Sequence, residues 1–252
     1  MFFPFGFGFD RTIVFMLPAL AFAMWAQWKV KSTFERYSRV RAANGLTGRD
    51  MAREIMARNG VTDVAVEAVG GALSDHYDPA SHTVRLSEPN YAGNSISSIA
   101  VAAHEVGHVL QHHDGYFPLQ LRSSIAPAAG FASTAAWPLF IIGLLIGPRL
   151  PLAGLLMDLG IAFFAGAVLF HIVTLPVEFD ASRRALVQLT STGAVLPQEV
   201  AGAKKVLDAA ALTYVAAAAM AALQLVRLLV LGSTVPAVAA VLAVSALRRL
   251  SI

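Results

Sequence analysis

His104-Glu105-Val106-Gly107-His108 is a His-Glu-x-x-His sequence, and the residue pattern around it predicts a helix from about Ser95 to His113. Residues four apart lie on the same face of an α-helix, so His104 and His108 can point their imidazoles at one metal ion. Glu105, one residue further round, can reach a water on that metal without being a ligand itself. This spacing predicts a zinc hydrolase with two histidine ligands and Glu105 as the catalytic base.

The composition of the chain is that of an integral membrane protein. Hydrophobic residues make up 56% of its 252 residues and charged residues only 14%, and the hydrophobic residues gather in long runs that a soluble core does not require. The net charge is +3, and the basic residues cluster beside these runs, which indicates orientation in a lipid bilayer rather than nucleic-acid binding. With no cysteine in the chain, any Zn²⁺ must be held by His and carboxylate groups.

The first hydrophobic run, from about Thr12 to Trp28, is just long enough to cross a bilayer. Met1–Asp10 has neither the basic start nor the small-residue cleavage site of a signal peptide, so we interpret the run as an uncleaved membrane helix. Basic residues then outnumber the single acid Glu35; they are Lys29, Lys31, Arg36, Arg39 and Arg41. By the positive-inside rule, the segment that follows faces the cytoplasm.

Residues 29–121 have the composition of a soluble part with a small β element. Thr47-Gly48-Arg49-Asp50 is typical of a capped helix start, and the helix is expected to close at Gly60. Short strands are predicted within Val61–Val69 and at Thr83–Ser87, separated by a turn from Asp75 to Ser81. A strand edge beside a metal-binding helix can bind an extended peptide by strand addition.

Three further hydrophobic runs predict membrane helices, at residues 125–147, 152–175 and 209–231. The first two form a hairpin that returns the chain to the side of the histidines. Residues 190–208 are a polar interlude before the last run. Residues 235–247 are too short to cross alone, and the sequence leaves open whether they re-enter the membrane, lie on it or return across it.

The predicted fold class is therefore a mainly α, multi-pass membrane protein, with a zincin-like catalytic domain and a small β element on about four transmembrane helices. Its segments, in chain order, are an N-terminal transmembrane helix (1–28), a cytoplasmic part with the metal-binding helix (29–121), a transmembrane hairpin (122–177), a cytoplasmic helix (178–208) and a C-terminal membrane part (209–252).

Catalytic zinc takes three protein ligands and keeps one position open, so a third ligand is needed. Without cysteine it is another His or a carboxylate, and Glu178 stands just past the hairpin on the correct side. For His112 and His113, at the end of the metal-binding helix, solvated or hydrogen-bonding roles are favoured over a second metal site. His76 either stabilises charge in the reaction or belongs to a simple Asx turn.

Four segments of this chain resemble the bacterial YugP-like neutral zinc metallopeptidases of the membrane. They are Ala26–Phe34 (AQWKVKSTF), Leu73–Pro79 (LSDHYDP), Ala103–His108 (AHEVGH) and Leu175–Ser182 (LPVEFDAS). That family is similar to the gluzincins, including HtpX-like and CAAX prenyl proteases, whose third zinc ligand is a Glu on a later helix.

The resemblance implies that Glu178 is the third zinc ligand. It also implies a metalloendopeptidase of the bacterial inner membrane that acts on a protein or peptide substrate, and the positive-inside rule predicts that its site faces the cytoplasm. In the related gluzincins an Asp commonly stands four residues after the ligand Glu, whereas this chain has Ser182. Ser182 can still donate a hydrogen bond, and Asp180 either orients a ligand histidine or is a solvated carboxylate.

Two other functions compete with this hypothesis. An intramembrane site-2-type protease also uses His-Glu-x-x-His, but there the sequence lies inside a spanning helix, and here the flanks are too polar and the apolar segment too short. A non-proteolytic membrane scaffold or assembly factor with a structural zinc would need no base such as Glu105. The sequence leaves a membrane-protein partner or an oligomer open.

Overall fold

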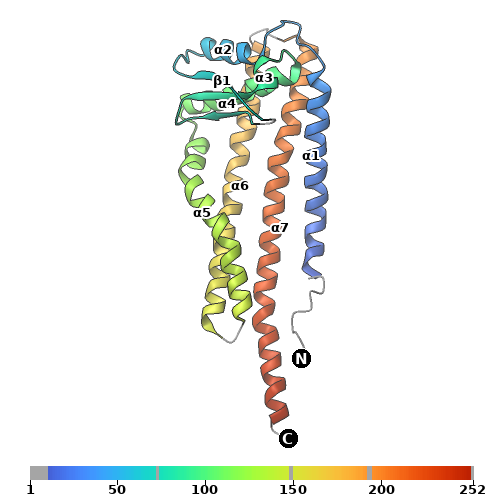
Figure 1. The fold of residues 1–252 in the computed structure, drawn as a ribbon, viewed down its shortest axis with the longest axis vertical. Coiled ribbons are helices and arrows are strands. Elements are labelled where there is room, and N and C mark those ends of the chain that lie inside the picture. Colours follow the sequence, from blue (N-terminus) through green and yellow to red (C-terminus); the bar gives the residue numbers. More distant parts are fainter. Residues whose placement is uncertain (1–10, 72–73, 148–149, 192–194, 251–252) are drawn as a thin grey trace. The chain divides into compact units, whose positions relative to one another are not determined.

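The computed structural model describes residues 11–71, 74–147, 150–191 and 195–250, and within them the side chains of residues 12–232. Figure 1 labels the helices α1 to α7 and the strand β1. In chain order, the elements are the 3-10 helix η1 (Arg11–Met16), α1 (Leu17–Ser38), α2 (Gly48–Arg58), β1 (Ala65–Val69), β2 (His76–Asp78), β3 (Thr83–Ser87), α3 (Glu88–Ala92), α4 (Ile96–His113), α5 (Phe117–Ile146), α6 (Pro151–Ser191) and α7 (Pro197–Leu250). Met1–Asp10, for which no signal peptide is predicted, lies outside the described residues.

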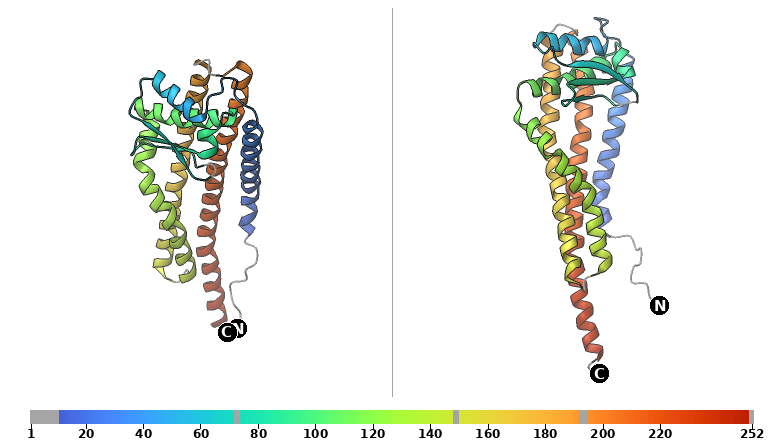
Figure 2. Two further views of the ribbon diagram at one scale, coloured as in Figure 1. Left: turned by 45° about the horizontal axis from the view of Figure 1, so that its top comes forward. Right: turned by 60° about the vertical axis from the view of Figure 1, so that its left-hand side comes forward.

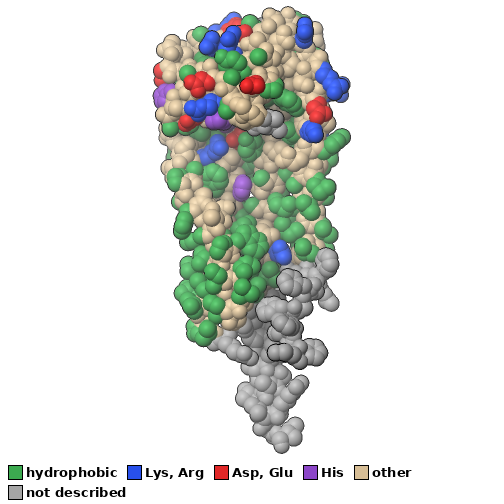
Figure 3. Space-filling model, in the orientation of Figure 1, with side chains coloured by type: hydrophobic (Ala, Val, Ile, Leu, Met, Phe, Trp, Pro, Cys, Tyr) green, Lys and Arg blue, Asp and Glu red, His purple; other side chains and the backbone are tan. Residues whose placement is uncertain are grey.

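Four of the described helices are long and apolar enough to cross a membrane: Thr12–Ser38, Phe117–Ile146, Pro151–Ser191 and Pro197–Gly232. On the face shown in Figure 3, charged side chains gather over the sheet and α2, whereas hydrophobic side chains cover much of α5 and α6. Exposed hydrophobic side chains along such helices suit a lipid environment. The helices and the small sheet confirm the predicted fold class, a mainly α membrane protein.

The chain forms two compact units, and the first comprises residues 1–23, 124–172 and 216–252. In this unit, α5 and α6 pack closely because glycines face the neighbouring backbone. A Cβ on Gly143 would lie 2.6 Å from the carbonyl oxygen of Ala153. Likewise, a Cβ on Gly160 would lie 2.8 Å from that of Ala136. Small residues at such contacts are typical of membrane helices.

The second unit, residues 24–123 and 173–215, holds the sheet and all the predicted metal ligands. β3 lies in the middle, with β1 parallel on one side and β2 antiparallel on the other. The sheet lies beside α2, α3 and α4 (Figure 2). Its inward residues, including Val84 and Leu86, share one hydrophobic core with Ile55 of α2 and Val106 of α4.

The helix starts of this unit follow from local hydrogen bonds. Asp50 N–H donates to Thr47 Oγ1 over 3.2 Å, and Thr47 N–H donates back to Asp50 Oδ2 over 3.4 Å, which confirms the predicted capped start of α2. Ser98 N–H donates to Ser95 Oγ over 3.1 Å, so Ser95 caps α4. This cap fixes the start of the helix that carries the two predicted histidine ligands.

The predicted turn over residues 75–81 is wrong in part, because His76–Asp78 forms the edge strand β2. Tyr77 pairs with Val84 of β3 and packs its ring against the core, and these contacts extend the backbone. The turn itself is shorter. Within it, Asp78 Oδ1 accepts the Ala80 N–H over 2.9 Å, an Asx turn as the sequence allowed.

The polar residues 190–208, within the predicted cytoplasmic helix 178–208, are divided between two helices. α6 continues through Pro176 to Ser191, and α7 already begins at Pro197. Proline suits a first helical position, and the Leu196 N–H donates to Glu199 Oε2 over 2.7 Å at this start. Residues 235–247, which the sequence left open, continue the helical backbone of α7.

Candidate metal centre

α4 and α6 bring together the three side chains that are predicted to bind zinc. His104 Nε2 lies 3.3 Å and His108 Nε2 lies 3.5 Å from Glu178 Oε2, and the ligand atoms of all three residues lie within 4.8 Å of one another. Donor atoms held about 2.0–2.1 Å from a tetrahedral zinc ion are about 3.4 Å apart. The three groups are therefore spaced to hold one metal ion.

The polar environment of Glu178 also fits a metal ion. Glu178 is only 2% exposed, and its Oε2 has no hydrogen-bond partner among the described residues. A buried carboxylate oxygen without a partner is costly, and a cation is the group that would satisfy it. Arg122 Nη1 lies 3.4 Å from Oε1, and the phenol of Tyr214 also interacts with this carboxylate. One oxygen is thus held by the protein while the other faces the two imidazoles.

Glu105 is buried beside the same cluster. Burial raises the pKa of its carboxyl, and the nearby imidazoles of His104 and His108 act against this rise. A carboxylate with a raised pKa is a stronger base than an exposed one and is better suited to take a proton from water near neutral pH. Its position one residue after His104 keeps it close to the metal ligands without being one of them.

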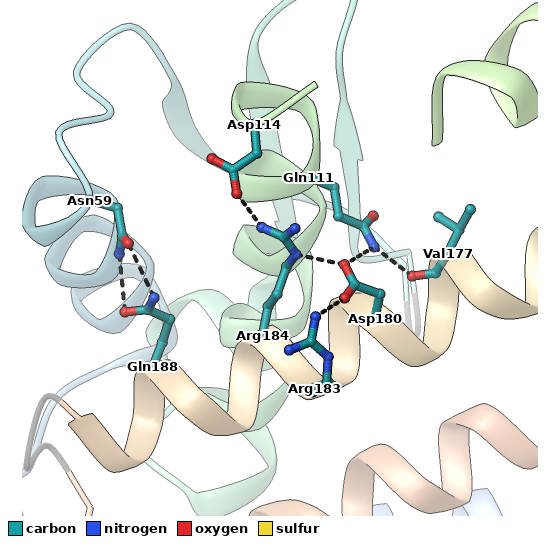
Figure 4. Close-up of polar contacts among 8 residues, drawn as sticks. All are labelled: Asn59, Gln111, Asp114, Val177, Asp180, Arg183, Arg184 and Gln188. Atoms are coloured by element: carbon teal, nitrogen blue, oxygen red, sulfur yellow. Dashed lines mark hydrogen bonds and ion pairs between the residues drawn. The ribbon is translucent and has the colours of Figure 1, made fainter. Parts of the chain in front are cut away.

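The outer ring nitrogens of both histidines have partners. Ser182 Oγ lies 3.2 Å from His104 Nδ1. The serine that stands where an Asp was expected therefore contacts a predicted zinc ligand. His108 Nδ1 lies 3.0 Å from Gln111 Oε1. Asp180 reaches His108 only through Gln111, whose Nε2 donates to Asp180 Oδ2 over 3.1 Å (Figure 4). Such outer partners fix the orientation of metal-binding imidazoles.

Asp180 is neither a solvated carboxylate nor a direct partner of a ligand histidine. It is 8% exposed and accepts hydrogen bonds from Arg183 and from Arg184 Nε, the latter over 2.6 Å (Figure 4). Arg184 also donates to Asp114, the residue that caps the C-terminus of α4. The carboxylate of Asp180 therefore joins α6 to the end of the metal-binding helix.

Other histidines lie apart from the cluster in the contacts described. His76 is exposed on β2, and its Nδ1 lies 2.7 Å from the Ser74 carbonyl oxygen, so its catalytic role stays a prediction. His112 Nδ1 lies 2.8 Å from the Tyr77 hydroxyl, a hydrogen-bonding role of the kind favoured from the sequence. His113 is exposed at the last residue of α4.

Three contributors to the site are absent from the sequence-based prediction. Gln111 is three residues after His108 on the same helix face, and this spacing is the signal that would have found it. Arg122 and Tyr214 come from α5 and α7, and no local pattern connects either with Glu178.

A membrane chain whose buried His-Glu-x-x-His helix meets a later glutamate has the parts of a membrane zinc metallopeptidase. The chain belongs to the family described as "Putative neutral zinc metallopeptidase", whose model matches residues 12–233. It is 52% identical over 215 residues to the "Putative membrane protease YugP" of Bacillus subtilis (strain 168), an alignment that covers 85% of this chain and 93% of that relative. No solved structure matches the chain. The resemblance found in the sequence is thereby confirmed.

Proposed function

We propose that this protein is a zinc-dependent metalloendopeptidase that hydrolyses peptide bonds of membrane-associated or membrane-proximal proteins at the cytoplasmic face of the bacterial inner membrane. The observation that carries the proposal is the cluster of the half-buried His104 with the buried His108 and Glu178, whose donor atoms lie within 4.8 Å of one another beside Glu105. Glu178 Oε2, which has no hydrogen-bond partner among the described residues, is the oxygen offered to the metal.

Each residue of the cluster has one role in this proposal. His104 and His108 bind through Nε2, the nitrogens that face Glu178. A zinc ion held by these three groups supplies a Lewis acid that makes water more acidic and polarises a peptide carbonyl. Glu105 accepts the proton of the attacking water and returns it to the leaving amine as the peptide bond breaks. Its burial keeps this carboxylate free of competing solvent.

Arg122 and Tyr214 act on Glu178 rather than on the substrate. The Arg122 guanidinium, 3.4 Å from Oε1, compensates the charge of the buried carboxylate and keeps Oε2 turned toward the histidines. Tyr214 adds a second contact to the same group. His76 stays a candidate for stabilising the charge that develops on the substrate carbonyl, because β2 is an edge strand to which an extended peptide could add.

The proposed orientation is supported by charge. The exposed residues Lys29, Lys31 and Arg36 follow the hydrophobic part of α1, and such clusters are retained in the cytoplasm. All three predicted zinc ligands belong to the unit that begins at Met24, the unit that includes this basic segment. A site on this side would meet protein segments at the cytoplasmic membrane surface.

Zinc quantification and proteolysis, measured on the same purified samples, test the proposal. We expect about one zinc per chain in the wild type and its loss in His104→Ala and Glu178→Ala, since a catalytic site needs all three protein ligands. Glu105→Gln should keep zinc and lose proteolysis of an unfolded protein such as casein. His113→Ala, an exposed histidine of the same helix, is the matched control and should keep both. Full activity in Glu105→Gln would disprove the role of the base, and undiminished zinc in Glu178→Ala would disprove the third ligand.

A further inference from the structure

Gln111 is the most completely buried polar side chain next to the metal centre, with 0% of its surface exposed. It stands on α4, and its amide contacts His108 of its own helix. The same amide donates to the backbone of α6 at Val177 (Figure 4). A buried amide must satisfy both its NH₂ group and its oxygen, so the partners of Gln111 determine which way it points.

The partners on α6 fix the amide in one orientation. Gln111 Nε2 lies 2.7 Å from the carbonyl oxygen of Val177 and 3.1 Å from Asp180 Oδ2. Both atoms only accept hydrogen bonds when the carboxylate is ionised, so the group that faces them must be the NH₂. The opposite orientation would place Gln111 Oε1 against two acceptors. The oxygen therefore faces His108.

This orientation decides where His108 carries its proton. Gln111 Oε1, 3.0 Å from His108 Nδ1, can only accept, so Nδ1 must donate. A neutral imidazole protonated at Nδ1 has its free lone pair on Nε2. Nε2 is the nitrogen that faces Glu178 Oε2, 3.5 Å away.

The far end of the amide is itself held in place. Asp180 is fixed by Arg184 and Arg183, and Arg184 also donates to Asp114 at the end of α4. The carbonyl of Val177 belongs to the residue before Glu178. The same amide group is thus bonded to one predicted zinc ligand and to the backbone next to another.

We propose that Gln111 is a positioning residue: it holds His108 in the tautomer that binds metal through Nε2 and ties that histidine to the turn of α6 that carries Glu178. The inference rests on the proposed zinc centre and adds a specific dependence of metal affinity on an amide that is not a ligand. Outer partners of metal-binding histidines typically change metal affinity about 10–100-fold when they are removed.

The test compares the zinc affinity of the full-length wild type and Gln111→Met by competition with a chelator. Gln111→Met keeps the length of the side chain and removes both hydrogen-bonding groups. Gln188→Met is the matched control, because Gln188 makes a similar pair of amide bonds to Asn59, 3.0 and 3.1 Å long, away from the metal ligands (Figure 4).

We expect Gln111→Met to bind zinc about 10–100-fold more weakly than the wild type, and Gln188→Met to match the wild type. Equal zinc affinity in Gln111→Met and wild type would overturn the inference while leaving the zinc centre intact. A wild type that binds no zinc would instead refute the proposed function.

Nitrogen-15 spectra of the zinc-loaded wild type, labelled at its histidines, test the same point without any variant. The His108 signals, assigned by their absence from His108→Asn, should show a protonated Nδ1 and a metal-bound Nε2. A metal-bound Nδ1 in the wild type would contradict the inference even if Gln111→Met did not fold.

Discussion

Gly107 faces the backbone of Ala181 so closely that a Cβ on the glycine would lie 2.4 Å from the Ala181 carbonyl oxygen. Gly107 stands between the two histidines in α4, and Ala181 stands in α6 one turn after Glu178. The missing side chain lets the two helices approach closely enough for His104 and His108 to meet Glu178. Gly107 therefore contributes to the candidate metal centre because it has no side chain to keep α4 and α6 apart.

Gly107→Ala should push α4 and α6 apart and weaken both folding and metal binding. The obstructing atom belongs to the backbone and cannot turn aside, so we expect a loss of about 1–3 kcal/mol in unfolding free energy and a lower zinc content. Gly166→Ala is the control in α6, because a Cβ there meets nothing within 4 Å. Thermal unfolding and zinc quantification measure both effects; unchanged values in Gly107→Ala would contradict this explanation.

Ser182→Ala should weaken zinc binding without unfolding the protein. The change removes the hydroxyl that lies 3.2 Å from His104 Nδ1, so the imidazole loses a partner that orients it, and we expect a drop of about tenfold in zinc affinity. Ser191→Ala, at the exposed end of the same helix, should leave affinity unchanged because its hydroxyl donates to the Gln188 carbonyl oxygen, away from the predicted metal ligands. If both variants bind zinc equally well, Ser182 has no such role.

The capping box of α2 should make stability depend on pH. The hydrogen bond from the Thr47 hydroxyl lowers the pKa of Asp50, and burial acts against this shift. The ionised Asp50 thus adds stability above its ordinary pKa of 3.8, and this stability is lost as the pH falls through the lowered value. Asp50→Asn should cost about 1 kcal/mol at pH 7 and progressively less in acid. Thermal unfolding across pH measures the difference, and a pH-independent gap would contradict the assignment.

Single cysteines should report the orientation of the chain, which contains no cysteine of its own. Thr62, exposed before β1, belongs to the unit with the metal ligands. On intact cells, a membrane-impermeant maleimide should label Thr62→Cys only after permeabilisation, since the basic residues after α1 favour the cytoplasm. Leu150→Cys, between α5 and α6, should be labelled directly. The reverse pattern would place the metal centre outside.

The parts of the fold that depend on local pattern could be predicted from the sequence. The hydrophobic runs predicted the long helices, Ser95 the start of α4, and Thr47 with Asp50 the start of α2. β2 was missed because three residues carry too little periodicity and its pairing with β3 is a tertiary contact. The sequence predicted one cytoplasmic helix over residues 178–208, and its division between the end of α6 and the start of α7 was not predicted because the polar pattern does not mark which neighbouring run each part continues.

Some residues of the candidate site could likewise be predicted from the sequence, and others could not. His104 and His108 follow from helical spacing, whereas Glu178 was placed by family resemblance, and the structure brings it to 3.3 Å and 3.5 Å from the two imidazoles. Arg122 and Tyr214 could not be predicted, since their only link to Glu178 is the packing of α5 and α7. Side chains that reach a site only through tertiary contacts cannot be identified from the spacing of residues in the sequence.

The unpartnered oxygen of Glu178 has a consequence for the life of the protein in the cell. Because Glu178 has a buried carboxylate oxygen with no hydrogen-bond partner among the described residues, zinc bound at the proposed centre would stabilise the folded state as well as supply its chemistry. Each tenfold excess of free zinc over the dissociation constant adds about 1.4 kcal/mol to folding stability. Zinc starvation should therefore lower the abundance of this protein as well as its activity, so that metal supply controls how much of it survives quality control in the membrane.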